Sequence, residues 1–202
     1  MAHLTLVTPA SAVSLLTEAR IHLRLGDDTG HDDRILAMLD GLVDDVEADT
    51  GRQLLTATWD YVLDGFPWKI ELPKPPVQSV TSITYTDEAG DSQTVSSSTY
   101  VVTKPGGVTG QRATISLASG QSWPTVLDQP DVVTVRFVSG YGASAVSLPK
   151  AIRLALFFGL EDLFDEPTVP VRAQGFRSDA SVVMGRLLAK FRTRPTIRVG
   201  YW

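Results

Sequence analysis

The spacing of apolar residues changes twice along this chain, and this change limits the fold more than any other feature. Residues 11–25 and 32–50 carry apolar side chains at three- and four-residue steps, as amphipathic helices do. Between residues 56 and 139, short runs of alternating apolar and polar residues end at turn residues, as strands do. Helical spacing returns over residues 151–164 and 179–191. We therefore expect an α+β protein with two helices, a block of strands and two more helices.

Neither pair of predicted helices has an obvious core of its own. The simplest arrangement therefore packs the two pairs together around one core. In that arrangement the second and fourth helices are in contact, and the strands form an insertion between the second and third helices. The predicted domains are a four-helix-type lobe from residues 1–53 and 147–202, which ends in an extended tail, and a β-rich insertion at residues 54–146. The chain has 202 residues, of which 43% are hydrophobic, enough for such a core.

Charge is distributed unevenly. Residues 1–53 contain 4 basic and 10 acidic side chains, residues 54–146 contain 5 and 8, and residues 147–202 contain 9 and 5, which gives −6, −3 and +4 and the total of −5. A protein that binds DNA tightly is normally basic, so we expect no such role. We expect instead that the acidic face around Asp40, Asp44 and Asp45 meets a basic surface from the C-terminal third of a neighbouring protein, with two ordinary solvated faces as the alternative.

The C-terminal tail combines arginines with large apolar residues. Pro195 favours an extended backbone at Arg194, and the alternation that follows suits an added strand. Tyr, Trp and Arg are also common anchors of protein interfaces. We expect the tail to dock onto a neighbouring protein, with folding back onto its own lobe as the alternative. The candidate interface residues are Arg192, Arg194, Ile197, Arg198, Val199, Tyr201 and Trp202.

A survey for chemistry finds no motif of an active site. The aspartates at positions 27, 28, 32 and 33 lack the spacing of a calcium loop. The glycine-rich residues 106–110 lack the Gly-Lys-Ser/Thr of a phosphate loop, and no Gly-x-Ser-x-Gly occurs. The pairs Glu161-Asp162 and Asp165-Glu166 are typical of a solvated helix end. Cysteine is absent, which excludes disulfides and favours the cytoplasm as the place of synthesis. We expect no catalytic residue, no cofactor, no metal and no membrane segment.

The chain carries an ordered series of short blocks, most of which are turns or helix ends. They are LTEARIHLR at 16–24, DDRI at 32–35, DTGRQL at 49–54, DGFP at 64–67, LPKPPV at 72–77, SVTSITY at 79–85, WP at 123–124, GYG at 140–142, LPKAI at 148–152 and LLAKFR at 187–192. In their order and spacing, over residues 11–192, these blocks resemble the head–tail connector, or adaptor, proteins of long-tailed phages and gene-transfer-agent particles.

The resemblance implies a structural subunit of a virion or similar particle, at the head–tail junction and without enzymatic activity. It implies a homo-oligomeric ring of roughly twelve copies below the portal protein, set by portal symmetry. Such a ring extends the DNA channel, lets DNA pass without binding it, and receives a tail-side stopper protein. The portal then becomes the expected partner of the tail. One departure concerns residues 164–167, which are acidic where the family usually has an arginine-containing polar stretch.

Two other classes of function stay open at this point. The first is a small hydrolase of the same particle, with Glu161 and Asp162 as candidate acid and base. The second is an accessory module that binds a carbohydrate or a peptide, for which exposed aromatic side chains among Trp59, Trp68 and Trp123 are needed.

Overall fold

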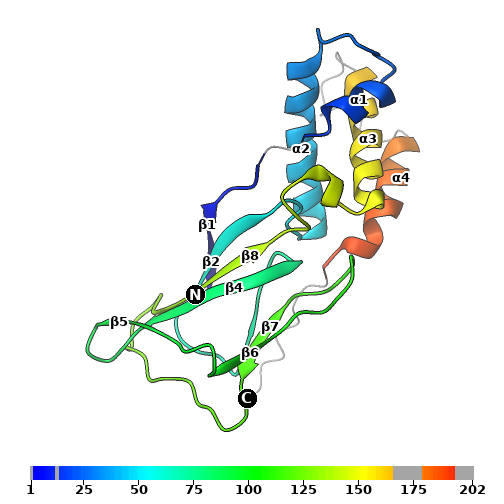
Figure 1. Ribbon diagram of the computed structural model, residues 1–202. Coiled ribbons are helices and arrows are strands. Elements are labelled where there is room, and N and C mark those ends of the chain that lie inside the picture. Colours follow the sequence, from blue (N-terminus) through cyan, green and yellow to red (C-terminus); the bar gives the residue numbers. More distant parts are fainter. Residues whose placement is uncertain (1, 12–13, 166–178, 194–202) are drawn as a thin grey trace.

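A computed structural model describes residues 2–11, 14–165 and 179–193 of the protein. The helices lie at one end of an elongated molecule and the strands at the other (Figure 1). Within the described residues, the α-helices are α1 (Leu16–His22), α2 (Asp32–Thr50), α3 (Lys150–Asp165) and α4 (Asp179–Leu188), with 3-10 helices η1 (Ala145–Ser147) and η2 (Ala189–Phe191). The strands are β1 (His3–Thr8), β2 (Ala57–Leu63), β3 (Lys69–Glu71), β4 (Val77–Thr86), β5 (Ser92–Thr94), β6 (Tyr100–Thr103), β7 (Thr114–Leu117) and β8 (Val133–Ser139). This confirms the predicted α+β class, with β2 to β8 between α2 and α3 and β1 before α1.

The strands form two antiparallel sheets. One has the order β1-β2-β8-β4-β5, and the other has the order β3-β7-β6. Both sheets contribute to one apolar cluster, in which Ile70 and Ile115 of the small sheet and Ile83 and Phe137 of the large sheet have no exposed surface. This core arises from the alternating pattern, because every second residue of a strand faces the same side.

The helices enclose a second apolar cluster, and α3 lies at its centre (Figure 1). Gly159 of α3 shows how closely its neighbours approach. A Cβ atom added there would lie 2.7 Å from Leu42 Cδ2 of α2 and 3.1 Å from Met184 Cε of α4. The helix α3 is therefore packed between α2 and α4, and the predicted packing of the second helix against the fourth is wrong, because each of them packs against α3 instead.

The first strand corrects the assignment of residues 1–53 to the helical lobe. The strand β1 pairs with β2 along its length, from His3 opposite Val62 to Thr8 opposite Thr58, and so belongs to the large sheet. The first helix is also shorter than predicted, because it begins at Leu16 rather than residue 11 and ends at His22 rather than residue 25. The division into domains at residues 54 and 146 otherwise stays a prediction.

Candidate assembly surfaces

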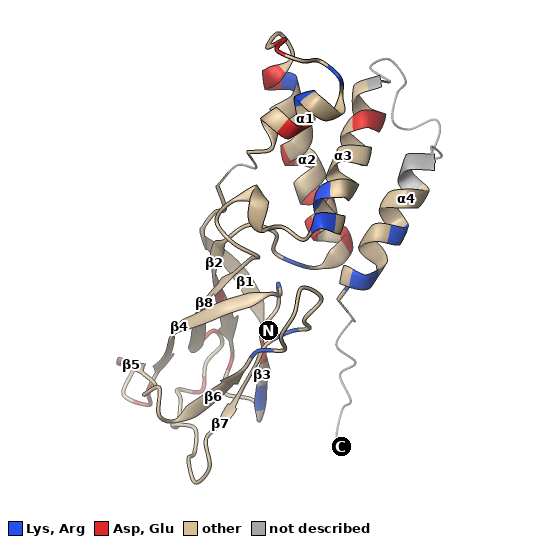
Figure 2. Ribbon diagram, turned by 45° about the vertical axis from the view of Figure 1, so that its right-hand side comes forward, with Lys and Arg blue, Asp and Glu red and all other residues tan. Residues whose placement is uncertain are grey.

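The helix α2 has a buried face and an acidic face. The residues Ile35, Leu39, Leu42 and Val46 are buried at helical spacing, as the sequence predicts. Exposed positions on the other side include the three aspartates predicted to form a ring interface, Asp40, Asp44 and Asp45. Within the described residues, no cation forms an ion pair with any of the three. Figure 2 shows the acidic segments of α2 and the basic segments of α4 on opposite sides of α3.

The chain after α4 returns to the end of α2. Arg192 donates from Nε to both carboxylate oxygens of Asp49, at 3.1 Å each, and its Nη2 lies 3.0 Å from Asp49 Oδ1. The amide of Thr193 donates to the carbonyl of Thr50 at 2.9 Å. Gly51 follows with a left-handed φ of 65° and leaves no room for a Cβ beside Thr193. Arg192, predicted to bind a neighbour, is therefore paired within its own chain.

The other predicted residues of the tail lie outside the described part of the chain. They are Arg194, Ile197, Arg198, Val199, Tyr201 and Trp202.

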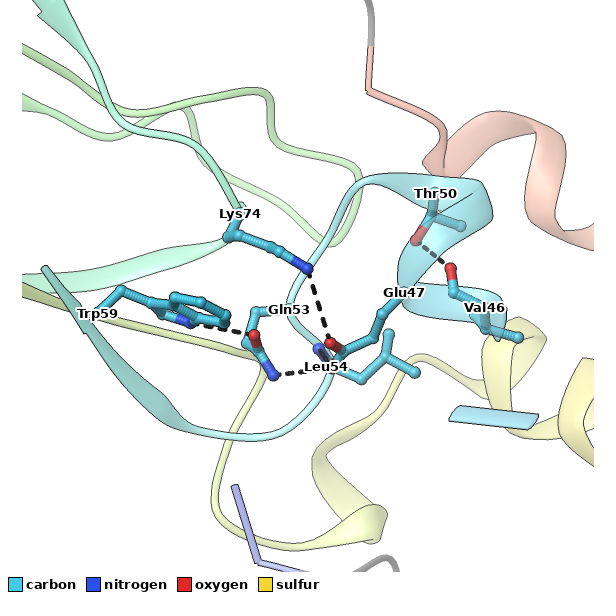
Figure 3. Close-up of polar contacts among 7 residues, drawn as sticks. All are labelled: Val46, Glu47, Thr50, Gln53, Leu54, Trp59 and Lys74. Atoms are coloured by element: carbon cyan, nitrogen blue, oxygen red, sulfur yellow. Dashed lines mark hydrogen bonds and ion pairs between the residues drawn. The ribbon is translucent and has the colours of Figure 1, made fainter. Parts of the chain in front are cut away.

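A polar network joins the C-terminal half of α2 to the large sheet (Figure 3). Glu47 accepts hydrogen bonds from the Leu54 amide and the Gln53 side chain, both at 2.8 Å, and lies 3.9 Å from Lys74 Nζ. The indole of Trp59 donates to Gln53 Oε1 at 3.1 Å, and Lys74 lies 5.4 Å from the centre of the Trp59 ring. Burial raises the pKa of Glu47, whereas the hydrogen bond from the Leu54 amide and the positive charge of Lys74 act to lower it. The network therefore fixes the angle between α2 and β2.

An open groove lies over this network, between α2 and the strand β1. Its volume is about 570 Å³. One wall is the acidic side of α2, and the other is formed by β1 and the residues that follow it. The lining residues are Leu6, Pro9, Ala10, Ser11, Asp40, Val43, Asp44, Glu47, Ala48, Gln53, Leu55, Ala57, Trp59 and Lys74. The acidic face thus continues into a partly apolar hollow.

Arg52 is buried completely at the junction of helices and strands. Its guanidinium donates to the carbonyl oxygens of Phe191 and Thr109, the latter at 3.1 Å, and to the Tyr141 hydroxyl at 3.3 Å. The Tyr141 hydroxyl in turn donates to the Val108 carbonyl at 2.7 Å, and burial raises the pKa of Tyr141. One side chain therefore ties α2 to the end of η2 and to the glycine-rich loop between β6 and β7, which the sequence identifies only as a loop.

The residues considered for metal binding are either engaged or scattered. Arg20 pairs with Asp32, and Asp28 accepts a hydrogen bond from the Gly30 amide at 2.8 Å. No group of three or more potential metal ligands occurs in the described part of the chain.

The candidate acid and base, Glu161 and Asp162, are consecutive residues near the end of α3. Glu161 lies 3.4 Å from His22 Nε2, and the side chains of Asp165 and Glu166 are outside the described residues.

The tryptophans differ in exposure. Trp123 stacks on Phe66 with ring centroids 4.6 Å apart, and Trp59 is part of the network of Glu47. Trp68 is 86% exposed, so it alone of these three tryptophans presents its ring to a partner. This does not form the aromatic surface that a carbohydrate-binding module needs.

No protein-family model and no curated protein sequence matches the chain. Chains of solved gene transfer agent (GTA) particles match its fold. One, from the neck of an empty GTA particle computed with C6 symmetry, has a TM-score of 0.77 and 24% identity, over 97% of this chain and 98% of that chain. Another, from the virion of a native GTA particle, has a TM-score of 0.74 and 24% identity, over 96% of this chain and 97% of that chain. A third, from the neck of a native GTA particle computed with C12 symmetry, has a TM-score of 0.73 and 22% identity, over 97% of this chain and 98% of that chain. The protein shares its fold with these chains.

The described helices include none that is long and apolar enough to cross a bilayer.

Proposed function

We propose that the protein is a structural subunit of the neck of a phage-like or gene-transfer-agent particle, where it acts as a head–tail connector without enzymatic activity. The observation that carries this proposal is the agreement of fold over 97% of this chain and 98% of a GTA neck chain, with a TM-score of 0.77. Both the helices and the strands are included in that agreement. The ordered blocks between residues 16 and 192 support it independently, since they resemble connectors at the level of sequence.

The proposed assembly is a ring below the portal protein that extends the DNA channel and receives a stopper protein on the tail side. Related necks computed with C6 and C12 symmetry support repeated copies around one axis, roughly twelve in this proposal. The net charge of −5 suits a channel from which DNA is repelled rather than bound. We place Asp40, Asp44 and Asp45 at the contact between neighbouring copies, because they are exposed and have no cationic partner among the described residues.

The tail is proposed as an arm that binds the portal. Its last described residue, Thr193, is held against the end of α2, so residues 194–202 start from a fixed point. Deleting residues 195–202 should leave a folded, soluble protein that no longer joins capsids. A truncated protein that unfolds, or one that still joins capsids, would contradict this arm.

The function is tested by deleting the gene in a strain that produces particles and restoring it on a plasmid. Without the protein we expect DNA-filled heads that lack tails, because the junction is incomplete. With the tagged protein, tails should return, and a gold label against the tag should lie at the head–tail junction. Intact tailed particles from the deletion strain, or a label elsewhere on the particle, would refute the proposal.

A further inference from the structure

The two outer helices of the helical lobe present free faces in opposite directions. Gly159 places α3 in close contact with both Leu42 of α2 and Met184 of α4. Since each outer helix packs one side against α3, the other sides of α2 and α4 point away from each other (Figure 1). A contact between such a pair of faces joins successive copies head to tail, and repetition of that contact closes a ring when the rotation allows it.

The free face of α2 combines acidic and small side chains. Its exposed residues include Asp40, Asp44 and Asp45, together with Ala37, Gly41 and Ala48. Asp40 and Asp44 are four residues apart, at which distance like charges repel each other. This face is therefore electrostatically unfavourable in the isolated chain, and its small residues leave space for a close partner.

The free face of α4 has the complementary composition. Val182, which is 52% exposed, and the exposed Arg186 lie on α4, and the exposed Ala189 and Lys190 follow in η2. Within the described residues, Arg186 and Lys190 form no ion pair, although Lys190 lies 5.2 Å from the centre of the Phe191 ring. The two cations are four residues apart in sequence, as are Asp40 and Asp44, and the chain between them passes from α4 into the tighter η2.

We propose that α4 of one copy packs against α2 of the next, with Arg186 and Lys190 opposite Asp40 and Asp44. The occupant of the acidic face is thus a second copy of this chain. This inference rests on the proposed ring and names its contact. The complementary charges of two faces on one chain carry it, because both are exposed and none of the four charged residues has an ionic partner among the described residues. Val182 then meets the small residues of α2, which permit the helices to approach closely.

Covalent trapping tests the contact directly, because the chain has no cysteine of its own. Particles assembled from the Ala37→Cys, Val182→Cys double variant should form disulfide-linked multimers under mild oxidation, since the two positions lie on the faces proposed to meet. Each single variant and the pair Trp68→Cys, Val182→Cys serve as controls. A ladder of multimers from the double variant alone supports the contact. Only monomer in particles that contain the protein would overturn the contact while leaving the proposed function intact.

Charge reversal provides the second test. Asp40→Lys with Asp44→Lys should lower incorporation into particles roughly tenfold, and so should Arg186→Glu with Lys190→Glu. The two pairs combined in one chain should restore incorporation. Glu88→Lys with Asp128→Lys makes the same change of charge at exposed sites in the loops after β4 and before β8 and should have little effect. Incorporation that is unchanged by either reversal, or that the combination does not restore, contradicts the contact. Loss only on deletion of residues 194–202 would assign the acidic face to the tail instead.

Discussion

On the large sheet, Asp60 of β2 faces Arg136 of β8 and accepts two hydrogen bonds from it, at 2.8 and 2.7 Å, whereas on α2 the aspartates Asp40 and Asp44 lie exposed. Asp87 likewise accepts hydrogen bonds within its own hairpin. Charged groups that have partners within the chain support the fold. The charged residues on the free faces of α2 and α4 have no such partners among the described residues, and we propose that they make contacts between copies. Mutations should separate the two kinds of charge.

The largest expected effect comes from the buried charge at the junction of the two regions. Arg52→Ala removes donors from two backbone carbonyls and from Tyr141, and should lower the free energy of unfolding by about 3 kcal/mol. The control Arg186→Ala, at an exposed cation, should change it by less than about 0.5 kcal/mol. Urea unfolding followed by circular dichroism measures both. Equal effects would mean that Arg52 is not needed for the fold.

Packing of the helical lobe gives the next effect. Gly159→Ala places a methyl group 2.7 Å from Leu42 Cδ2, and should cost about 1–3 kcal/mol in the free energy of unfolding. Gly41→Ala in α2 meets no described atom within 4 Å and should stabilise the isolated chain by up to about 1 kcal/mol, because alanine favours helix. Thermal denaturation of both variants measures the difference. A stabilising Gly159→Ala would show that α3 is not held tightly between its neighbours.

Smaller effects compare the paired and unpaired aspartates directly. Asp60→Asn should lower the free energy of unfolding, since Arg136 loses its charged partner. Asp44→Asn should instead stabilise it by about 0.2–0.5 kcal/mol, because the repulsion from Asp40 disappears. Denaturation at low salt is the appropriate measurement, since salt screens both effects. A loss of stability in Asp44→Asn would mean that this carboxylate has a role within the isolated chain.

The smallest effect distinguishes two carboxylates by pH. Burial raises the pKa of Glu47, so its contribution to stability decreases as pH rises from the ordinary glutamate value through the raised pKa. Hydrogen bonds from the Asp91 amide and Gln93 lower the pKa of Asp87, so its contribution is lost as pH falls below the ordinary aspartate value. The free energy of unfolding is measured from about pH 3 to about pH 7. The pH dependence due to Glu47 should be absent in Glu47→Gln, and the one due to Asp87 should be absent in Asp87→Asn. Parallel changes in the two variants would contradict these assignments.

Local patterns predict much of the fold. The helix α2 is strongly periodic and ends at Gly51, so its existence and its acidic face follow from the sequence. The strands β2, β4, β6, β7 and β8 lie within the block of strands predicted between residues 56 and 139. By contrast, β1 was missed because its pairing with β2 connects residues fifty or more positions apart. The position of α3 between α2 and α4 also depends on tertiary packing, through Gly159, rather than on spacing.

The site was predicted less completely than the fold. Exposure of Asp40 and Asp44 follows from helical periodicity, but the role of Arg52 does not follow from its turn. Its partners Tyr141, Thr109 and Phe191 are 89, 57 and 139 residues away along the chain. The signal that could have identified it is an arginine directly after the glycine that ends an amphipathic helix. Arg192 was predicted to bind a neighbour because a sequence gives no indication of its proximity to Asp49.

The most direct test of the account is a cryo-electron microscopy map of the neck of the particle that contains this protein. The account predicts a ring of copies of this fold at the head–tail junction, with Arg186 of α4 and Lys190 of η2 in each copy facing Asp40 and Asp44 of α2 in the next. A neck without this fold would contradict the proposed function. A ring in which the free face of α2 meets solvent or another protein would contradict the proposed contact between copies.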